Sequence, residues 1–503
     1  MTSARSRIET DLLSVVSLMC IAAFVVILSI VAAGDPGARR LLTVVIIGMA
    51  AGGLILFRQL RKAASSLIAS EARAHYAATH DHLTQLPNKA LFVERLRCVA
   101  QNRGGGEPDT GYGIVCVGLD RFDEINEALG LEACHSVIGE VATRLRLARR
   151  DQDAIAKLGD DVFAVLWPGL TAAEAPAVVA RLIEQLSAPY AASDGRAFVT
   201  CSIGVGLLAP EIDNPMETLR QAQIALSNAK RRGGAHVSLF EPSMDRALKD
   251  RKALEVELRR ALADEALTVV YQPQVDAKGA IIGVEALMRW DSPTRGAVPP
   301  SLFVPLAEAC GLADVLGRFA LRRAFLDAKA WPGLKVAVNV SAAQVRSGGL
   351  IDTLKSLIAE IGADPRGFEL EITEGMLLAD EADIYQTLND VRRMGFSLSL
   401  DDFGTGYSSL SYLRHFPVDK LKIDRSFVAH LGKRPESSAI IKAIVDMADA
   451  LGLNVIAEGV ETKDQVLRLT MAGCAQFQGF YFSRPMEAGA IDALLTARAR
   501  RVA

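Results

Sequence analysis

The longest apolar runs of the chain lie within residues 1–57. Residues 12–34 form an uncharged run of 23 residues, and residues 41–57 form a second uncharged run of 17. A helix rises about 1.5 Å per residue, so roughly 20 apolar residues cross a hydrocarbon core of about 30 Å. The pattern therefore predicts an N-terminal two-helix transmembrane hairpin, with spans at 12–34 and 41–57.

Basic residues flank both spans and bear on their orientation. They precede the first span, occupy the connection and follow the second span: Arg5, Arg7, Arg39, Arg40, Arg58, Arg61 and Lys62. Their slight excess at the outer flanks indicates that both ends of the hairpin face the cytoplasm. The prediction is a multi-pass protein of the inner (cytoplasmic) membrane with its remaining domains in the cytoplasm.

Two other interpretations of the apolar runs are weaker. Val31-Ala32-Ala33 resembles a cleavage site, but the preceding run is longer than a usual signal-peptide core, and Glu9 and Asp11 are unexpected in a basic leader. A buried core helix does not suit residues 41–57, because that run is apolar on every side and a basic cluster ends it. An uncleaved anchor is therefore favoured.

Residues 58–80 have the composition of a helical linker. They are rich in Ala and basic residues and contain neither Gly nor Pro. A thin, partly heptad-like apolar stripe runs along them at Leu60, Ala64, Leu67 and Ala74. This stripe suits a parallel coiled coil, so we expect a homodimer, although the stripe alone does not secure the oligomeric state.

Residues 81–243 alternate between strand and helix patterns. Two apolar runs around the turn Gly159-Asp160-Asp161 predict a β-hairpin. Further buried strands and a helix are predicted at 113–119, 198–208 and 216–232. The order indicates an α/β sandwich with an antiparallel component.

Residues 250–495 contain eight short apolar runs that alternate with helical stretches. These runs are 267–272, 281–287, 336–340, 368–372, 396–400, 420–423, 455–457 and 477–482. Eight strands alternating with helices over about 245 residues predict a (β/α)8 TIM-like barrel.

Polar side chains recur where these apolar runs end. They are Glu285, Asn339, Glu371, Glu374, Asp401, Asp402, Lys422, Glu458 and Gln478. In a barrel these ends converge on one mouth, where uncompensated carboxylates repel one another. Cations are the natural compensation, and oxygen ligands without His or Cys favour Mg²⁺ or Mn²⁺ over zinc.

Composition limits the class of protein. The 503 residues suggest about three domains, and 50% apolar with 23% charged residues excludes general disorder. A net charge of −3 gives no electrostatic reason to expect a nucleic-acid polymer as partner. The 7 Cys contain no CxxC pair, so no disulfide framework or structural zinc site is indicated. The high mean hydropathy, +0.22, is largely accounted for by the two apolar spans.

The motifs of region 250–495 resemble those of the EAL family of cyclic di-GMP phosphodiesterases. The namesake motif is Glu285-Ala286-Leu287. The other signatures are Tyr271-Gln272-Pro273, Asn339-Val340-Ser341, Glu371-Ile372-Thr373-Glu374, Asp401-Asp402-Phe403-Gly404-Thr405-Gly406, Leu421-Lys422-Ile423-Asp424, Ala457-Glu458-Gly459 and Gln478-Gly479-Phe480. The resemblance covers the whole region and implies hydrolysis of cyclic di-GMP to linear pGpG.

The resemblance also implies a role for each matching residue. One ion would be held by Glu285, Asn339, Glu371 and Asp401. A second ion would be held by Asp402 with the shared Asp401 and Glu458. Catalytic and supporting roles fall to Lys422, Glu458, Gln478 and Glu374, the last as a support for the loop 402–409. Substrate contacts fall to Gln272, Leu287 and Arg289, and the general base is either Asp402 or Lys422.

Region 81–243 resembles the GGDEF family of diguanylate cyclases, on its opening residues 81–88 and its closing residues 229–234. The family's turn Gly-Gly-Asp-Glu-Phe reads here Gly159-Asp160-Asp161-Val162-Phe163, and the family's first-strand metal Asp is Gly118. Neither Val nor Gly supplies a side-chain ligand, so the domain is expected to be degenerate. A cation site at Asp120, Asp160 and Asp161 is the weaker alternative to a solvated turn.

Two further positions concern nucleotide binding by this region. Guanine-reading Asn126 is kept, whereas its partner position is His135. Arg150 and Asp153 match the family's RxxD inhibitory site, and a surface ion pair explains them equally well. We expect GTP or cyclic di-GMP as the ligands of a regulatory domain.

The leading hypothesis is a membrane-anchored cyclic di-GMP phosphodiesterase with an inactive GGDEF domain as regulator. The alternative is a receptor or scaffold that binds cyclic di-GMP without hydrolysing it and acts through protein contacts. The complete ligand set argues against that alternative. A bifunctional cyclase and hydrolase ranks below both, because it needs an unconventional metal site around Gly118 and Val162.

Overall fold

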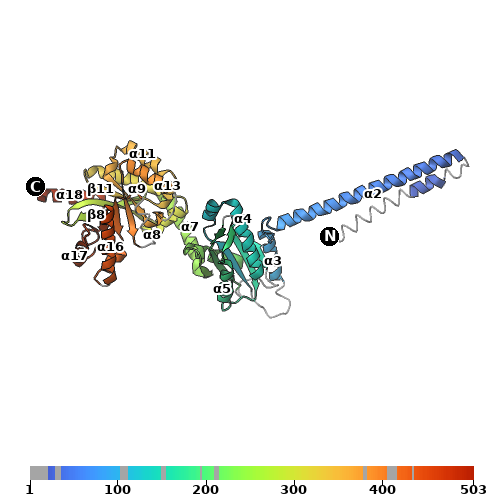
Figure 1. Cartoon of the computed structure of the whole chain (residues 1–503), viewed down its shortest axis with the longest axis horizontal. Helices are drawn as coiled ribbons and strands as arrows, with labels where there is room; N and C mark the ends of the chain where they lie inside the picture. The colour runs from blue at the N-terminus through green and yellow to red at the C-terminus, as the bar shows by residue number, and fades with distance from the viewer. Residues whose placement is uncertain are drawn as a thin grey trace. The chain divides into compact units, whose positions relative to one another are not determined.

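The computed structural model describes most of the chain in two compact units, Met1–Leu248 and Lys249–Ala503 (Figure 1). The described residues are 21–28, 36–101, 112–148, 154–192, 195–208, 214–377, 382–404, 416–432 and 435–502.

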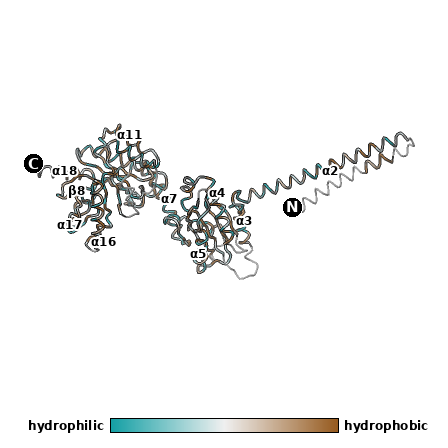
Figure 2. Tube along the Cα trace, viewed as in Figure 1, coloured by the Kyte–Doolittle hydropathy of each residue, from teal (hydrophilic) through white to brown (hydrophobic). Residues whose placement is uncertain are grey.

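A single long helix precedes the first globular domain. Helix α2, Pro36–Thr79, has 44 residues, or about 66 Å of length. It joins the predicted second span and the predicted linker 58–80 into one element, because no Gly-Pro break or capping residue separates them. Its more hydrophobic residues are concentrated in its first half (Figure 2), and Val44, Ile47 and Leu54 there are exposed.

The two-helix hairpin is not supported by the described residues. Among them, one helix, Thr43–Thr79, is long and apolar enough to cross a membrane by length and composition. The predicted first span, 12–34, lies outside the described residues except for a helical stretch at 21–28.

Local hydrogen bonds explain why α2 ends at Thr79. The Asn88 side-chain amide donates to the carbonyl of Ala78 at 2.8 Å, and the Asn88 backbone N–H donates to the carbonyl of Thr79 at 2.9 Å. Asp81 then accepts bonds from the backbone N–H and the hydroxyl of Thr84, which closes a turn. The chain therefore leaves the helix through a fixed corner.

The first unit is built around a five-stranded sheet in the order β2-β3-β1-β6-β7. Its strands are β1 Tyr112–Leu119, β2 Ala154–Lys157, β3 Val162–Pro168, β6 Cys201–Leu207 and β7 Val237–Leu239, with a separate hairpin of β4 Tyr190–Ala192 and β5 Gly195–Ala197. Its helices are α3 Lys89–Gln101, α4 Phe122–Ala148, α5 Ala175–Leu186 and α6 Pro215–Arg231. The β2–β3 pairing confirms the predicted hairpin.

Alternating side chains of the sheet build two cores. On β1, Val115 and Val117 pack on the face with α4 and α5, whereas Ile114 and Cys116 pack on the face with α3 and α6. Helix α6 lies directly on the backbone of β6, because a Cβ added at Gly204 would meet the backbone N of Leu226 at 2.0 Å. The predicted α/β sandwich is thus an α/β/α arrangement.

The second unit is a closed barrel of eight strands, as predicted, with a ninth short strand at its edge. The strands are β8 Leu267–Asp276, β9 Ile281–Ser292, β10 Gly296–Val298, β11 Lys335–Asn339, β12 Phe368–Thr373, β13 Ser397–Phe403, β14 Lys420–Ile423, β15 Asn454–Ala457 and β16 Gln476–Gln478. The helices are α7 Pro242–Ala263, α8 Pro300–Ala309, α9 Ala313–Asp327, α10 Ala342–Arg346, α11 Leu350–Ile361, α12 Glu374–Leu377, α13 Ala382–Arg393, α15 Arg425–Ala429, α16 Pro435–Leu451, α17 Lys463–Met471 and α18 Ala488–Val502. Short 3-10 helices lie at η2 Ala328–Ala330 and η3 Pro365–Gly367.

The strict alternation of strands and helices is wrong for the first two barrel strands. β8 pairs antiparallel with both β9 and β16, whereas the pairings from β9 through β16 around the barrel wall are parallel. Residues 277–280 join β8 to β9 directly, and a connection of four residues is too short for a crossover helix. Glu285 accordingly lies within β9 rather than at its end.

Candidate active site

Strand register brings three predicted ligand residues together. On β11, Ala337 lies opposite Glu285 of β9, and Asn339 lies opposite Glu371 of β12. Side chains alternate along a strand, so residues two apart share a face. Asn339 Nδ2 donates a hydrogen bond to Glu285 Oε1 at 2.9 Å, which fixes the first pair at the mouth of the barrel.

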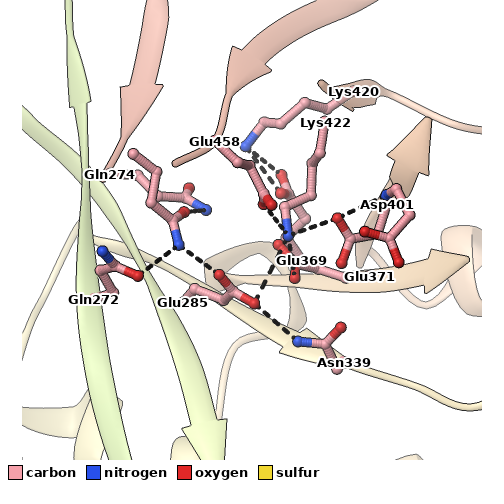
Figure 3. A network of polar contacts seen from close by, with 12 residues as sticks. Gln272, Gln274, Glu285, Asn339, Glu369, Glu371, Asp401, Lys420, Lys422 and Glu458 are labelled. Atoms are coloured by element: carbon pink, nitrogen blue, oxygen red, sulfur yellow. Dashed lines mark hydrogen bonds and ion pairs between the residues drawn. The ribbon is translucent and has the colours of Figure 1, made fainter. Parts of the chain in front are cut away.

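The ammonium of Lys422 lies at the centre of this cluster (Figure 3). It is 2.7 Å from Glu371, 2.6 Å from Glu458 and 3.1 Å from Asp401, measured to carboxylate oxygens. A fourth carboxylate, Glu285, lies at 3.7 Å. The side chains of Lys422 and Glu371 are 1% and 0% exposed, so water screens this attraction little.

Three glutamines line the side of the cluster nearest β8. Gln478 Nε2 donates to Glu285 Oε2 at 2.5 Å and to Gln272 Oε1 at 3.3 Å. Gln274 Nε2 donates to Gln478 Oε1 at 3.1 Å. Because β8 runs antiparallel to β9 and β16, Gln272 faces Glu285 across one pairing and Gln274 faces Gln478 across the other.

Burial and mutual charge set the pKa values of these groups. Burial, followed by the charge of Glu285, raises the pKa of Glu371 well above its ordinary value. Burial also raises the pKa of Glu458 to about 8, although Lys422 opposes this shift. For Glu285, burial is outweighed by Lys422 and by donated hydrogen bonds, so its pKa is lowered. Burial acts against the charge of Lys422, but the four carboxylates raise its pKa well above the ordinary value.

The cluster fits a hard divalent cation. Ligand atoms of Glu285, Glu371 and Asp401 all lie within 4.8 Å of one another. The Oε1 atom of Glu371 is buried and has no hydrogen-bond partner among the described residues. Carboxylate and amide oxygens are the ligands of Mg²⁺ and related ions, and the three-residue group contains no sulfur or imidazole ligand.

Comparisons with known proteins divide the chain in the same way. Residues 255–485 match the family described as EAL domain, and residues 78–236 match the family described as Diguanylate cyclase, GGDEF domain. An uncharacterized protein of Mycobacterium bovis is 36% identical over 439 residues, which cover 86% of this chain and 70% of that protein. The chain belongs to the GGDEF-EAL tandem family.

Two further relatives are informative. The bifunctional diguanylate cyclase/cyclic di-GMP phosphodiesterase MucR of Pseudomonas aeruginosa is 36% identical over 457 residues, covering 89% of this chain and 66% of that protein. The solved structure of the Vibrio cholerae LapD S helix-GGDEF-EAL segment, bound to c-di-GMP, has a TM-score of 0.53 and 19% identity. It covers 83% of this chain and 99% of that chain, and it shows the shared fold alone. The GGDEF-EAL chain spans 53% to 66% of the length of three curated relatives that it matches.

The predicted supporting loop of the EAL domain is described only at its start. Glu374, at the beginning of α12, accepts a hydrogen bond from the backbone N–H of Gly404 at 2.8 Å. Asp402 has a φ of +54°, a left-handed conformation that is uncommon for residues other than Gly but that Asp adopts more readily than most, and its N–H donates to Asp401 Oδ1 at 3.0 Å. Burial, then the charges of Asp401 and Asp424, raise the pKa of Asp402. Asp402 does not belong to the compact three-carboxylate group, and residues 405–415 lie outside the described residues.

The predicted substrate residues of the EAL domain continue outward from the cluster. Leu287 and Arg289 follow Glu285 at two-residue intervals on β9 and therefore share its face. Gln272 is held by a hydrogen bond from its Nε2 to the carbonyl of Ser483 at 3.1 Å. Burial lowers the pKa of Arg289, and the nearby charge of Glu285 opposes that shift.

The GGDEF domain has a different arrangement at its turn. Asp161 is paired with Lys230 of α6 at 2.5 Å, and a Cβ added at Gly118 would meet Lys230 Cε at 2.6 Å. Lys230 therefore fills the space beside Gly118 and neutralises a turn carboxylate, so the turn is not simply solvated.

The structure describes Asp120 of the GGDEF domain but not the predicted inhibitory site. Asp120 is buried and accepts hydrogen bonds from Thr200, Ser202 and the backbone N–H of Ala235, which accounts for it structurally. Arg150 and Asp153 lie outside the described residues, so their nucleotide-binding role stays a prediction.

Sequence reasoning missed three polar residues inside the EAL barrel: Gln274, Glu369 and Lys420. Glu369 and Lys420 lie near the amino-terminal ends of β12 and β14, away from the barrel mouth, and Gln274 lies on the antiparallel strand β8. The available signal was the period-two alternation of β12 and β14, which places Glu369 and Lys420 on the same inward faces as Glu371 and Lys422.

Proposed function

We propose that the chain hydrolyses cyclic di-GMP to linear pGpG with two divalent ions, Mg²⁺ or Mn²⁺, at the mouth of the EAL barrel. The observation that carries this proposal is the meeting of four carboxylates around Lys422 at one barrel mouth. The name of one relative supports the substrate class, because MucR is named a bifunctional diguanylate cyclase/cyclic di-GMP phosphodiesterase.

In this proposal the acidic residues hold the ions. Glu285, Asn339, Glu371 and Asp401 would bind one ion, and Asp402 would bind the second with Asp401 and Glu458. Ions bound there would lower the pKa of a water molecule and neutralise charge on the scissile phosphate. The short distances within the Glu285, Glu371 and Asp401 group support the first site.

The remaining residues would bind substrate and position the reacting groups. Lys422, held by its carboxylates, would stabilise charge on the phosphoryl group and steady the attacking water. Gln478 would orient the same region, because it already donates to Glu285 and Gln272. Leu287 and Arg289 would line the substrate groove with Gln272, and Glu374 would hold the loop through Gly404.

We also propose that the GGDEF domain lacks cyclase activity and acts as a regulator. Two-metal phosphoryl transfer needs carboxylates on both sides of the ions. Here Gly118 and Val162 supply none, and Lys230 already neutralises Asp161. GTP, or cyclic di-GMP at Arg150 and Asp153, would be its ligand.

The proposal also includes attachment of the whole chain to a membrane through α2 and dimerisation along that helix.

Turnover of cyclic di-GMP by the purified full chain in detergent tests the hydrolase. We expect pGpG with Mg²⁺ or Mn²⁺, and a loss of at least about 100-fold in kcat for Glu285→Gln. Glu255→Gln, at a partly exposed residue of α7 that is paired with Arg259, is the matched control and should retain activity. Binding of cyclic di-GMP without pGpG formation by the wild type would instead favour the receptor hypothesis.

The same preparation tests the GGDEF domain. Incubation with GTP and Mn²⁺ should give no cyclic di-GMP, whereas GTP should change the rate of pGpG formation. An unaltered rate together with no detectable GTP binding would refute the nucleotide-sensing role.

A further inference from the structure

A second buried ion pair lies beneath the catalytic cluster of the EAL barrel. Lys420 Nζ is 2.9 Å from Oε1 and 2.8 Å from Oε2 of Glu369, so it engages both oxygens. The two side chains are 10% and 3% exposed. Figure 3 shows this pair beside the Lys422–Glu371 contact. Interiors of TIM barrels are usually filled by branched apolar residues, so a charged pair at this level requires an explanation.

The lower pair repeats the upper pair at a distance of two residues. Glu369 and Glu371 are both on β12, and Lys420 and Lys422 are both on β14. The polarity is the same in both pairs, with the acid on β12 and the base on β14. The residues of each strand that lie two apart point to the same side, so all four side chains enter the barrel interior.

Both pairs cross over the intervening strand β13. Ser399 on β13 is in register with Glu371 on one side and Lys420 on the other. Ser399 is fully buried, and its hydroxyl has no hydrogen-bond partner among the described residues. Its contribution is therefore its small size, which lets a side chain of β12 meet a side chain of β14 above it.

We propose that Glu369 and Lys420 are a positioning pair that holds Glu371 and Lys422 at the geometry of the metal site. The two contacts tie β12 to β14 at two heights that are two residues apart on each strand. Without the lower pair, β14 would be joined to β12 by one buried side-chain contact, Lys422–Glu371, about which it can tilt. Loss of only one partner of either pair would leave a buried charge unpaired, which is costly in a site of low dielectric constant. The lower pair thus fixes the relative height of the ligand Glu371 and of Lys422. This inference rests on the proposed hydrolase function.

The test compares metal binding and turnover in the full chain. The variant Glu369→Gln/Lys420→Met removes both charges and keeps the side-chain lengths. We expect its Mn²⁺ dissociation constant, measured from the free-ion signal in electron paramagnetic resonance, to rise about 10-fold or more. We expect kcat for cyclic di-GMP to fall by a similar factor, with KM changed less than about twofold, because the substrate residues on β8 and β9 are untouched.

Two single variants provide the controls. Ser399→Ala removes only an unpartnered hydroxyl and should match the wild type. Lys420→Arg keeps a cation that can engage both oxygens of Glu369 and should retain most of the wild-type Mn²⁺ affinity. Should the double variant fail to fold, Ser399→Val replaces it, because a branched side chain would separate Glu369 from Lys420; it should bind Mn²⁺ at least about 10-fold more weakly.

Several results would overturn the inference. The inference fails if the double variant has the Mn²⁺ affinity and kcat of the wild type. It also fails if the melting temperature of the double variant falls while Mn²⁺ affinity and kcat stay unchanged, since that result indicates only a structural role. Wild-type Mn²⁺ affinity in Ser399→Val would count equally against it. A wild-type chain that binds Mn²⁺ but does not hydrolyse cyclic di-GMP would contradict the proposed function alone, because weaker Mn²⁺ binding in the double variant would still support the positioning pair.

Discussion

At the scale of single residues, Lys422 is the most constrained side chain of the EAL barrel. Its ammonium lies within ion-pair distance of four carboxylates, and the Lys422 side chain is 1% exposed. A buried charge of this kind stabilises the fold only while all of its partners are present. Its removal should therefore affect stability as well as activity.

We expect Lys422→Met to destabilise the metal-free protein, because the carboxylates would be left buried without a cation. A loss of about 3 to 5 kcal/mol corresponds to a fall on the order of 10 °C in melting temperature for a domain of this size. Thermal unfolding in EDTA measures this fall, and Mn²⁺ should narrow the difference from the wild type. Lys442→Met breaks an exposed pair with Asp446 on α16 and should change the melting temperature very little. Equal melting temperatures for Lys422→Met and the wild type would contradict the expectation.

Residue-scale prediction from the sequence succeeded where a polar side chain ends an apolar run. Glu371, Asp401 and Lys422 stand out in this way, and the structure brings them together. Glu369 and Lys420 did not stand out, because they lie at the beginnings of the runs 368–372 and 420–423 rather than at the ends that face the barrel mouth. Which inward residues meet depends on the stagger between strands, and the sequence pattern does not specify stagger.

At the scale of elements, the corner after α2 connects the long helix to the hairpin of the GGDEF domain. Asp81 in this corner is paired with Lys157 of β2 at 3.1 Å. Burial alone would raise the pKa of Asp81, but bonds from Thr84 and the pair with Lys157 outweigh it, so the pKa is lowered. The pair therefore stabilises the fold only while Asp81 is ionised.

This lowered pKa predicts a pH dependence of stability. The contribution of Asp81 is fully present above its unfolded pKa, about 3.9, and is lost as pH falls through its folded pKa. Asp81→Asn should be less stable at pH 7 by about 2 kcal/mol and should lose this part of the acid dependence. Unfolding followed by the fluorescence of Trp167 in the same domain, from pH 7 to pH 2, measures both effects. An acid limb identical to that of the wild type would refute the assignment.

The contact between α6 and β6 gives a second prediction at this scale. Gly204→Ala would place a Cβ at 2.0 Å from the backbone N of Leu226, so the helix must move away from the sheet. We expect a loss of at least about 3 kcal/mol in the unfolding free energy of the GGDEF domain. Gly139→Ala on α4 meets no atom within 4 Å and should be neutral or slightly stabilising. Denaturant titration of both variants measures their unfolding free energies. Equal unfolding free energies for Gly204→Ala and Gly139→Ala would show that α6 does not pack on this backbone.

Element types were predicted well from periodicity, but strand direction was not. Periodicity is the same for parallel and antiparallel strands, so the barrel was expected to alternate strands with helices throughout. The eight residues between the predicted strands 267–272 and 281–287 were an available signal, because a parallel crossover needs a dozen residues or more. The predicted second span, 41–57, and the predicted linker, 58–80, were separated by their difference in charge, although the backbone is one continuous helix.

At the scale of the whole molecule, α2 contains the one described helical segment that is long and apolar enough to cross a membrane. Its apolar half is exposed rather than buried in the described structure. We expect the full chain to sediment with membranes and to resist carbonate extraction. In a variant that begins at Pro36 and so lacks the other apolar run, 12–34, Ile47→Lys/Leu54→Lys should release the protein, because a charge at the centre of a span costs about 3 kcal/mol. Leu60→Lys/Leu67→Lys lies on the later, charged part of the helix and should remain bound; release of both variants, or of neither, would argue against a spanning role.

The reversed direction of β8 determines at which end of the EAL barrel the preceding chain segment is connected. In an all-parallel barrel the preceding segment arrives at the floor, the full height of the wall away from the site. Here Leu267 pairs with Trp290 near the far end of β9, so α7 delivers the chain to the rim. From there to Gln272 is about 17 Å along one strand. The chain therefore enters the barrel at its open end. A displacement of α7 would act directly on the rim of the active site, without being transmitted through the barrel wall.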